Sequence, residues 1–243
     1  MKDLKTKAIV VRTTDYKDYD RLVTLITDNL GKITVLMKGC RKPTAKLRFA
    51  SVPMFFGEYI LNETAGRYTV TGCDCIEPFY NLSQDIDSYY CACCMLQTLD
   101  RVSQDGENTA PVLSILVRHL AMLTQGAIPS YEVLIRFIDA FTIEGGYSVG
   151  LTTCRMCGDR VIEGVSTSEG VSCKGCKSHS LDIIVLDASV MEYLYEVLTE
   201  QVHSRVISRD LIQKSLKFVF NYQNKLLGVK INAFEEYLKV LNL

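Results

Sequence analysis

The sequence lacks long apolar runs. None of its 243 residues belongs to a stretch approaching the roughly 18 apolar residues that a membrane-spanning helix needs. Charged residues at positions 2, 3, 5 and 7 precede the short apolar segment Ala8–Val11, which is far below the roughly 7–15 residues of a signal-peptide core. We therefore expect a cytoplasmic protein without a membrane partner.

Two other kinds of segment are missing. The pair Gly145-Gly146 lacks the Gly-Lys-Ser/Thr ending of a phosphate-binding loop, so no nucleotide site is expected. Internal repeats and low-complexity tracts are absent as well. With 48% hydrophobic and 23% charged residues, the composition is that of an ordinary globular protein, and the length suits one large domain or two to three small ones.

Charge is segregated along the chain, although the formal net charge is only −1. Residues 1–50 hold 12 basic and 5 acidic residues, a net charge of +7. The remainder holds 15 basic and 23 acidic residues, a net charge of −8. This asymmetry indicates that the N-terminal part is the face for a polyanion.

The first 80 residues have the alternation of β-strands, and the residues after Pro78 have the periodicity of helices. Five short antiparallel strands fit a small closed barrel. They are predicted at 8–13, 22–27, 32–38, 54–61 and 68–76. Ser83 is expected to cap a first helix reaching about Gln104. Five further helices are expected from Thr109, from Ser130, at 188–203, at 208–227 and from Asn232.

Four cysteines have the spacing of a metal site. Two residues separate Cys154 from Cys157 and Cys173 from Cys176, and fifteen residues lie between the pairs. Each pair can direct two sulfurs at one ion, and two pairs complete a tetrahedron. Without a signal peptide the thiols are expected to stay reduced, so paired cysteines indicate metal ligands. We predict one structural zinc ion, since four protein ligands leave no open catalytic position.

Cysteines at this spacing also have other uses in proteins. A zinc deaminase would need a nearby carboxylate, which Cys154-Arg155-Met156 lacks. An iron–sulfur cluster and a redox thiol pair stay open, because spacing alone excludes neither. The other six cysteines are expected to pack as small hydrophobes. His119, His179 and His203 are scattered and are expected to be core or surface residues.

The segment 32–48 contains six basic residues and no acidic residue. Gly39 and Pro43 predict a loop after the third strand. A basic loop beside a small barrel can follow a phosphate backbone, and the alternative is a solvated loop that only keeps the protein soluble. Tyr59 and Tyr68 are candidates for stacking with bases, but aromatic residues at strand spacing are expected in the core.

Several short motifs, in order along the chain, resemble the RecO family of bacterial DNA repair proteins. The similarity covers most of the chain and is sharp only in these segments. They are Ala8–Arg12, Asp15-Tyr16, Asp20–Leu25, Gly31-Lys32, Lys38–Pro43, Arg136-Phe137, Gly146-Tyr147 and Cys154-x2-Cys157-Gly158.

The resemblance implies an α+β fold. An N-terminal OB-like five-stranded β-barrel is followed by an α-helical domain with an inserted four-cysteine zinc module. The expected boundaries are 1–80 for the DNA-binding barrel, 81–150 for the first helical part, 151–180 for the zinc module and 181–243 for the second helical part.

The resemblance also implies a function. Family members bind single- and double-stranded DNA, anneal complementary strands, and engage RecR and the C-terminal tail of single-strand-binding protein. They thereby help RecA load on coated DNA. The implied role is that of a non-enzymatic recombination mediator in a RecF-type repair pathway, associated with the bacterial nucleoid.

Site residues are implied by position. Arg136 matches a helix arginine expected to face a partner such as the tail of single-strand-binding protein. Cys40 replaces the usual small residue of a Lys-Gly-x-Arg motif, which predicts modest affinity for bare DNA. The barrel arginines and the basic loop together give the expected DNA-binding residues Arg12, Arg21, Lys32, Lys38, Arg41, Lys42, Lys46 and Arg48.

Two other classes of function stay open. A metallohydrolase or thiol oxidoreductase that used the cysteine cluster would require an open metal position or an exposed thiol of low pKa. A protein-only interaction module would use the basic loop for an acidic protein tail and never for DNA.

Overall fold

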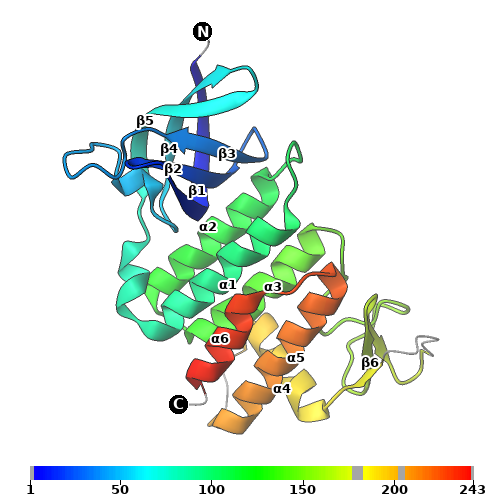
Figure 1. The fold of residues 1–243 in the computed structure, drawn as a ribbon. Helices are drawn as coiled ribbons and strands as arrows, with labels where there is room; N and C mark the ends of the chain where they lie inside the picture. The colour runs from blue at the N-terminus through cyan, green and yellow to red at the C-terminus, as the bar shows by residue number, and fades with distance from the viewer. Residues whose placement is uncertain (1–2, 177–182, 202–205, 242–243) are drawn as a thin grey trace. The chain divides into compact units, whose positions relative to one another are not determined.

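The computed structural model describes residues 3–176, 183–201 and 206–241, and the chain forms two compact units, Met1–Gln125 and Gly126–Leu243. The first unit contains the β-barrel and two helices, and the second contains four helices and a small sheet (Figure 1). The finer domain boundaries at 80, 150 and 180 stay a prediction.

Five strands form the closed barrel, in the order β1-β2-β3-β5-β4 with β4 returning to β1. All neighbours are antiparallel except β3 and β5, which run parallel where Val35 lies opposite Tyr68. A small five-stranded barrel of this kind is OB-like, which confirms the predicted architecture. The strands are β1 (Asp3–Tyr16), β2 (Asp20–Thr27), β3 (Lys32–Met37), β4 (Phe56–Thr64) and β5 (Arg67–Glu77).

The barrel interior is filled by alternate residues of the strands, as the two-residue period requires. Val23, Leu25 and Val35 have no exposed surface. Tyr59 is equally buried, and its hydroxyl donates a hydrogen bond to the Ala50 carbonyl at 2.7 Å, so the prediction that Tyr59 is a core residue is confirmed. Tyr68, in contrast, is only partly buried at the edge of this core.

Two helices, α1 (Ile86–Val102) and α2 (Ala110–Gln125), complete the first unit. Asp85, and not the predicted Ser83, caps α1, because Asp85 is extended and its carboxylate accepts the Ser88 N–H at 2.8 Å. Ser83 lies instead in a short 3-10 helix, η2 (Tyr80–Gln84). The Thr109 hydroxyl joins the helices to the barrel by donating to the Thr27 carbonyl at 2.6 Å.

The second unit contains helices and a three-stranded sheet of order β7-β6-β8. The helix predicted at 188–203 ends earlier, because Thr199 caps it and Glu200 takes a left-handed conformation with φ 58°. The elements are α3 (Ser130–Glu144), β6 (Gly164–Thr167), β7 (Gly170–Cys173), β8 (Ile184–Val185), α4 (Ala188–Leu198), α5 (Arg209–Leu227) and α6 (Asn232–Leu241).

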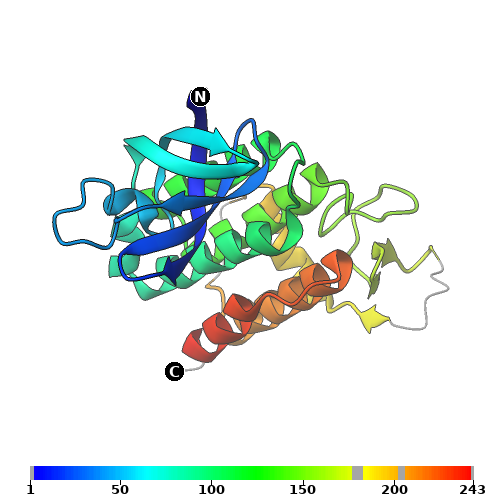
Figure 2. The same ribbon diagram turned by 45° about the horizontal axis from the view of Figure 1, so that its top comes forward.

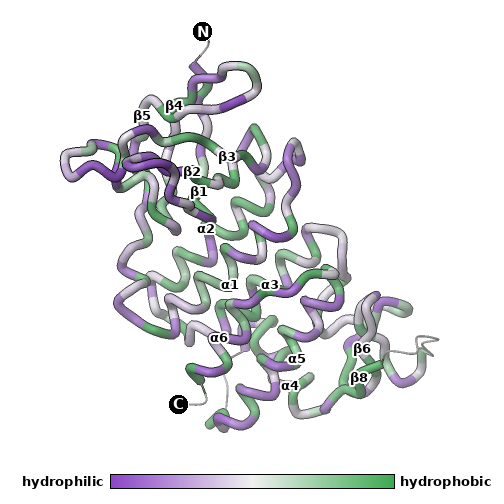
Figure 3. Tube along the Cα trace, in the orientation of Figure 1, coloured by the Kyte–Doolittle hydropathy of each residue, from purple (hydrophilic) through white to green (hydrophobic). Residues whose placement is uncertain are grey.

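Apolar and hydrophilic segments alternate along the helices (Figure 3). Across the described part of the chain, no helix combines the length and the apolar character that a membrane crossing requires.

Candidate metal centre and basic loop of the barrel

Two tight turns present the four cysteines of the spaced motif. In the first turn, the Gly158 N–H donates to the Cys154 carbonyl at 2.8 Å, and Gly158 has φ +79°, a conformation that favours glycine. In the second, the Cys176 N–H donates to the Cys173 carbonyl at 3.0 Å. A hairpin connects the two turns, since β6 and β7 pair with Thr167 opposite Gly170.

The four sulfur atoms converge on one point. All lie within 4.8 Å of one another, and the Cys157 and Cys173 Sγ atoms are 3.8 Å apart. A tetrahedron with metal–sulfur bonds of about 2.3 Å has sulfur–sulfur edges of about 3.8 Å. The group therefore fits a single metal ion, whereas a cluster would place several metal atoms between the sulfurs and hold them farther apart.

The protonation of the thiols also suits a metal. Burial raises the pKa of Cys154, but backbone N–H groups outweigh it and lower the pKa to about 6; one of them, the Cys173 N–H, donates to its sulfur at 3.3 Å. The Asp159 N–H lowers the pKa of Cys157, yet hydrogen bonding with Cys154 raises it to about 12. Without a cation, adjacent thiols therefore resist simultaneous ionisation, and a bound cation would relieve this opposition.

Basic residues around the motif already have partners. Arg155 pairs with Glu169, and Lys174 pairs with Glu163 at 3.1 Å. The Arg160 guanidinium lies over the Tyr195 ring, 3.7 Å from its centroid. Lys177, a further basic residue next to the motif, lies outside the described residues.

The remaining cysteines and histidines divide by burial. Cys40, Cys91 and Cys94 are buried as predicted, Cys73 and Cys93 are half-buried, and Cys75 is exposed, which contradicts the prediction for that residue. His119 is a core residue that is 1% exposed. His179 and His203 lie outside the described residues.

The basic loop, residues 38–48, projects from the barrel in both ribbon views (Figure 1, Figure 2). Its base is fixed by the Asp20 carboxylate, which accepts the Gly39 N–H at 2.7 Å, and by the Arg41 N–H, which donates to the Tyr19 carbonyl at 2.9 Å. Cys40, 2% exposed, packs into the barrel core between these two anchors. The loop therefore starts from a rigid base.

Four of the eight predicted DNA-binding residues form ion pairs. Arg21 and Arg41 each lie 3.1 Å from Asp15. Arg12 and Lys32 both pair with Asp100 of α1, at 3.0 and 3.2 Å. The Lys32 side chain is only 17% exposed, so this pair joins the barrel to α1 and leaves little of Lys32 for a ligand.

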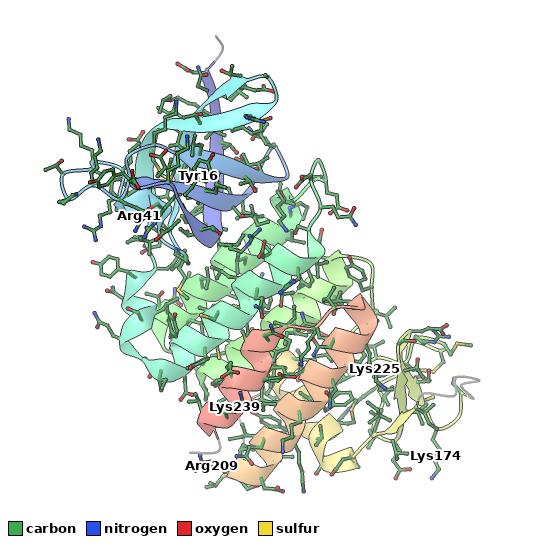
Figure 4. All side chains as sticks on the ribbon, viewed as in Figure 1. Tyr16, Arg41, Lys174, Arg209, Lys225 and Lys239 are labelled. Atoms are coloured by element: carbon green, nitrogen blue, oxygen red, sulfur yellow. The ribbon has the colours of Figure 1, made fainter. Side chains whose placement is uncertain are left out.

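The other four predicted residues, Lys38, Lys42, Lys46 and Arg48, are exposed. Within the described ranges, no carboxylate lies within 4.0 Å of their charged groups. The Lys42 ammonium lies over the Tyr19 ring, 5.5 Å from its centroid. Figure 4 shows Arg41 at the start of this loop and Tyr16 on the barrel beside it.

Arg136 lies on α3 in the second unit. Its side chain is 16% exposed, and it pairs with Glu200 at 2.8 Å. Its Nε atom is buried and has no hydrogen-bond partner among the described residues. A role in partner binding stays a prediction for this residue.

Tyr16 and Tyr19 were not among the site residues predicted from the sequence, although Tyr16 belongs to the motif Asp15-Tyr16. Both lie at the turn between β1 and β2 and are 40% and 51% exposed. In the sequence, only their position could have indicated a role. In the structure they are exposed aromatic residues beside a basic loop, which is the chemistry of a nucleic-acid surface.

Comparison with known families matches both parts of the chain. A model described as "Recombination protein O N terminal" matches residues 1–79, and one described as "Recombination protein O C terminal" matches residues 83–233. The second match includes all four clustered cysteines.

Three proteins of similar sequence each have the name "DNA repair protein RecO". The protein of Clostridium novyi is 26% identical over 97% of this chain and 94% of its own length. That of Acetivibrio thermocellus is 24% identical over 100% and 98%, and that of Caldicellulosiruptor bescii is 29% identical over 74% and 75%.

Proposed function

The chain belongs to the recombination protein O family of DNA repair proteins, and from this premise we propose that it is a non-enzymatic DNA-binding recombination mediator. Its barrel binds and anneals DNA strands, and the protein helps RecA load on DNA coated by single-strand-binding protein. It acts in the cytoplasm, at the nucleoid.

One observation carries the proposal: the basic loop presents uncompensated positive charge. Lys38, Lys42, Lys46 and Arg48 are exposed and unpaired within the described ranges, whereas the other basic residues of the predicted set are held by Asp15 and Asp100. Cations that are not already neutralised gain most from phosphate contacts, because each contact releases condensed counterions.

Annealing follows from the same charge. A loop that projects from the barrel can lie between two phosphate backbones and lower their repulsion, which needs no nucleotide hydrolysis. RecR and the C-terminal tail of single-strand-binding protein are the proposed protein partners, with Arg136 as a candidate contact for the tail once Glu200 is displaced.

The metal is proposed to be a single zinc ion, held by Cys154, Cys157, Cys173 and Cys176. Zinc would supply a tetrahedral crosslink between the two cysteine turns and no reaction, because a four-thiolate site has no open position. Metal analysis of the purified protein tests this: one zinc per chain is expected, and iron at that stoichiometry would contradict it.

The proposed function is tested by fluorescence anisotropy of labelled single-stranded and duplex DNA across a salt series. Lys42→Ala/Lys46→Ala/Arg48→Ala should weaken both complexes and reduce the salt slope for single strands by about 2, since each lost phosphate contact removes about 0.7. The matched control is Lys174→Ala/Lys214→Ala/Lys230→Ala, which removes the same charge from ion-paired lysines of the second unit.

Equal weakening by both triple variants would indicate a bulk charge effect and contradict a DNA surface at the loop. A wild-type protein that does not bind DNA even at low salt, but binds an acidic peptide, would establish the protein-only alternative.

A further inference from the structure

The four clustered cysteines differ in their access to solvent. Cys154 is 1% exposed, Cys173 and Cys176 are half-buried, and Cys157 is exposed. Met156, which precedes Cys157, is 61% exposed, so the outer end of the first turn faces solvent. Since the oxidation of thiolates follows their exposure, Cys157 is the sulfur that a small oxidant reaches first.

A second sulfur lies within reach of Cys157. The Cys157 and Cys173 Sγ atoms are 3.8 Å apart, and they must approach by about 1.8 Å to reach the length of a disulfide bond, about 2.0 Å. Cys173 is held on β7, where it pairs with Gly164 of β6. The end of the first turn has room for this movement, because a Cβ at Gly158 would meet nothing within 4 Å.

Cys154, in the same turn as Cys157, is a poorer partner because hydrogen bonds hold it in place. Its N–H donates to the Asp159 carbonyl at 2.8 Å, and its carbonyl accepts the Gly158 N–H at 2.8 Å. Its sulfur accepts the Cys173 N–H at 3.3 Å. The favoured crosslink therefore joins the two turns and does not close within the first one.

Cys173 also has free space beside it. A cavity of about 460 Å³ is lined by Cys173 and Cys176 and by apolar residues of β6 and β8. Gly175 leaves the Cys173 sulfur uncovered, since a Cβ at this position would lie 3.9 Å from it. The cavity can admit a molecule as small as hydrogen peroxide, because a water molecule takes up only about 30 Å³. It also gives the Cys173 side chain space to turn toward Cys157.

The exposed Cys75 of the barrel provides a contrast. Cys73 lies two residues before it on β5, and this spacing places side chains of one strand face about 6.6 Å apart. A disulfide requires Cβ atoms about 3.5–4.5 Å apart, so these two thiols do not pair without movement of the strand. Exposure alone therefore leads to an oxidised thiol, whereas exposure with a second sulfur at 3.8 Å leads to a crosslink.

We propose that Cys157 is a peroxide-sensitive modification site and that Cys173 converts its oxidised form into a disulfide. The inference rests on the proposed zinc site and goes beyond it, because it gives a structural crosslink a reversible redox chemistry. All four sulfurs are thiolates in the metal-bound site, since only the deprotonated form binds a metal, and the thiolate is the form that attacks peroxide.

Hydrogen peroxide is the oxidant, and the atoms balance in two steps. The Cys157 thiolate attacks one peroxide oxygen, the O–O bond breaks, and the departing hydroxide takes up a proton to become water, which leaves a sulfenic acid on Cys157. The Cys173 thiolate then attacks that sulfur, the S–O bond breaks, and the second hydroxide takes up a proton as well. One peroxide is reduced to two waters, and two thiolates are oxidised to one disulfide.

The crosslink removes two of the four metal ligands. Cys154 and Cys176 are left, and they take up protons as the ion dissociates, because two thiolates do not complete a tetrahedral site. The disulfide keeps the two turns joined after the metal has left. Reduction by a dithiol in the presence of zinc should therefore restore the original site.

The sequence allows the disulfide to be located directly. Arg155, Arg160 and Lys174 separate the four cysteines, so trypsin places each one in a different peptide. Metal-loaded protein is treated with hydrogen peroxide, its free thiols are alkylated, and the denatured protein is digested and analysed by mass spectrometry. The expected product joins the peptide of Cys157 to that of Cys173. A disulfide within either turn, or sulfinic acid at Cys157 without any disulfide, would overturn the proposal.

Two matched variants test the roles of individual cysteines. Cys157→His and Cys176→His each convert the site to three cysteines and one histidine, a set that also holds zinc. Zinc release by peroxide, followed with a chromogenic chelator, should slow several-fold in Cys157→His. It should stay near the wild-type rate in Cys176→His, which keeps the pair of Cys157 and Cys173. Equal rates in the two variants would contradict the assignment.

Cys75 serves as an internal gauge of exposure to peroxide. Oxidation of Cys75 without zinc release from the wild type would also overturn the proposal. Metal analysis before peroxide is added separates this outcome from failure of the proposed zinc site. Protein that contains no zinc would contradict the metal, whereas peptide mapping of that same protein still tests whether Cys157 and Cys173 form the disulfide.

Discussion

The cysteine site and the basic loop differ in how well the sequence predicts where their functional atoms lie, because cysteine side chains are short and those of lysine and arginine are long. A cysteine sulfur lies one bond from Cβ, so two tight turns fix all four sulfurs within 4.8 Å of one another. The charged group of lysine or arginine ends a long flexible stem and pairs with whichever carboxylate is near. Arg12 and Lys32 reach Asp100 on a helix that lies 88 and 68 residues away along the chain, a pairing that no local pattern indicates.

The comparison predicts independence: the cysteine site stabilises its own module, and the barrel binds DNA without it. The largest expected effect tests this. Metal removal by a chelator, or Cys157→Ser, should unfold residues 151–176, since structural zinc contributes about 10–16 kcal/mol of binding free energy in small zinc domains. Trypsin cleavage at Arg155 and Arg160, followed by mass spectrometry, reports the unfolding.

DNA anisotropy on the same metal-free sample provides the control. The affinity should stay within about twofold of the metal-bound protein. A parallel fall in DNA affinity would show that the two regions act as one site and would contradict their predicted independence.

Within the cysteine module, backbone crowding predicts the next largest effect. A Cβ at Gly164 would lie 2.0 Å from the Ser172 carbonyl oxygen, so Gly164→Ala must displace β7 and the adjacent Cys173. The expected destabilisation is about 3 kcal/mol. Gly158→Ala is the matched control, because its Cβ meets nothing within 4 Å and only the left-handed backbone costs about 1–2 kcal/mol. Thermal unfolding with metal analysis measures both, and equal losses would contradict the crowding argument.

In the barrel unit, Asp100→Ala tests whether the ion-paired basic residues stabilise the fold and leave DNA binding to the unpaired ones. Arg12 and Lys32 would lose their shared partner, and the free energy of unfolding should fall by about 1–3 kcal/mol. DNA affinity should be unchanged or slightly higher, because a negative charge is removed. Urea unfolding and anisotropy together test this, and a stability unchanged from wild type would show that the ion pairs are not structural.

The smallest expected effect concerns the segment that leads into the first cysteine turn. The Asp139 carboxylate on α3 accepts the Leu151 N–H at 2.6 Å. Burial raises the pKa of Asp139 above its ordinary 3.8, and the Leu151 N–H partly offsets this. A raised pKa in the folded state stabilises the fold below about pH 4, and this contribution is lost as the pH rises through the folded-state pKa.

Asp139→Asn, which cannot ionise, should therefore gain stability relative to wild type as the pH rises above about 4. Urea unfolding of both proteins at matched pH values measures the difference, so that effects of pH on the metal cancel. Asp187→Asn should show the opposite trend, because hydrogen bonds from Ser189 lower the pKa of Asp187. A difference that does not vary with pH would contradict the role of burial.

Sequence patterns predicted the architecture well where short-range patterns of residue type agree with the burial of those residues in the structure. Alternation located all five barrel strands, and the cysteine spacing predicted the convergence of four sulfur atoms that could hold a metal ion. The ends of helices were harder to predict, because Asp85 and Ser83 are both residue types that favour the N-cap position. Asp85 caps α1 because the chain enters a 3-10 turn after the left-handed Phe79, and tertiary packing decides that conformation.

The barrel surface was the least predictable part. Leu22, Leu36, Asn62 and Tyr68 come from four strands, and only the parallel contact between β3 and β5 brings them to one groove. Nothing in the linear order indicates that the buried Asn62 Nδ2 atom has no hydrogen-bond partner among the described residues. Alternation alone also assigned Tyr68 to the core, because alternation does not show that residue 68 lies at the barrel rim.

The closure of the barrel has a consequence for synthesis on the ribosome. β5 bonds to both β4 and β3, so until it emerges, each of these strands has an unpaired edge. A nascent chain that ends before Arg67 therefore exposes two strand edges, which are templates for intermolecular pairing. The domain can become safe from aggregation only after about residue 77 has left the exit tunnel, and truncations before that point should depend on chaperones.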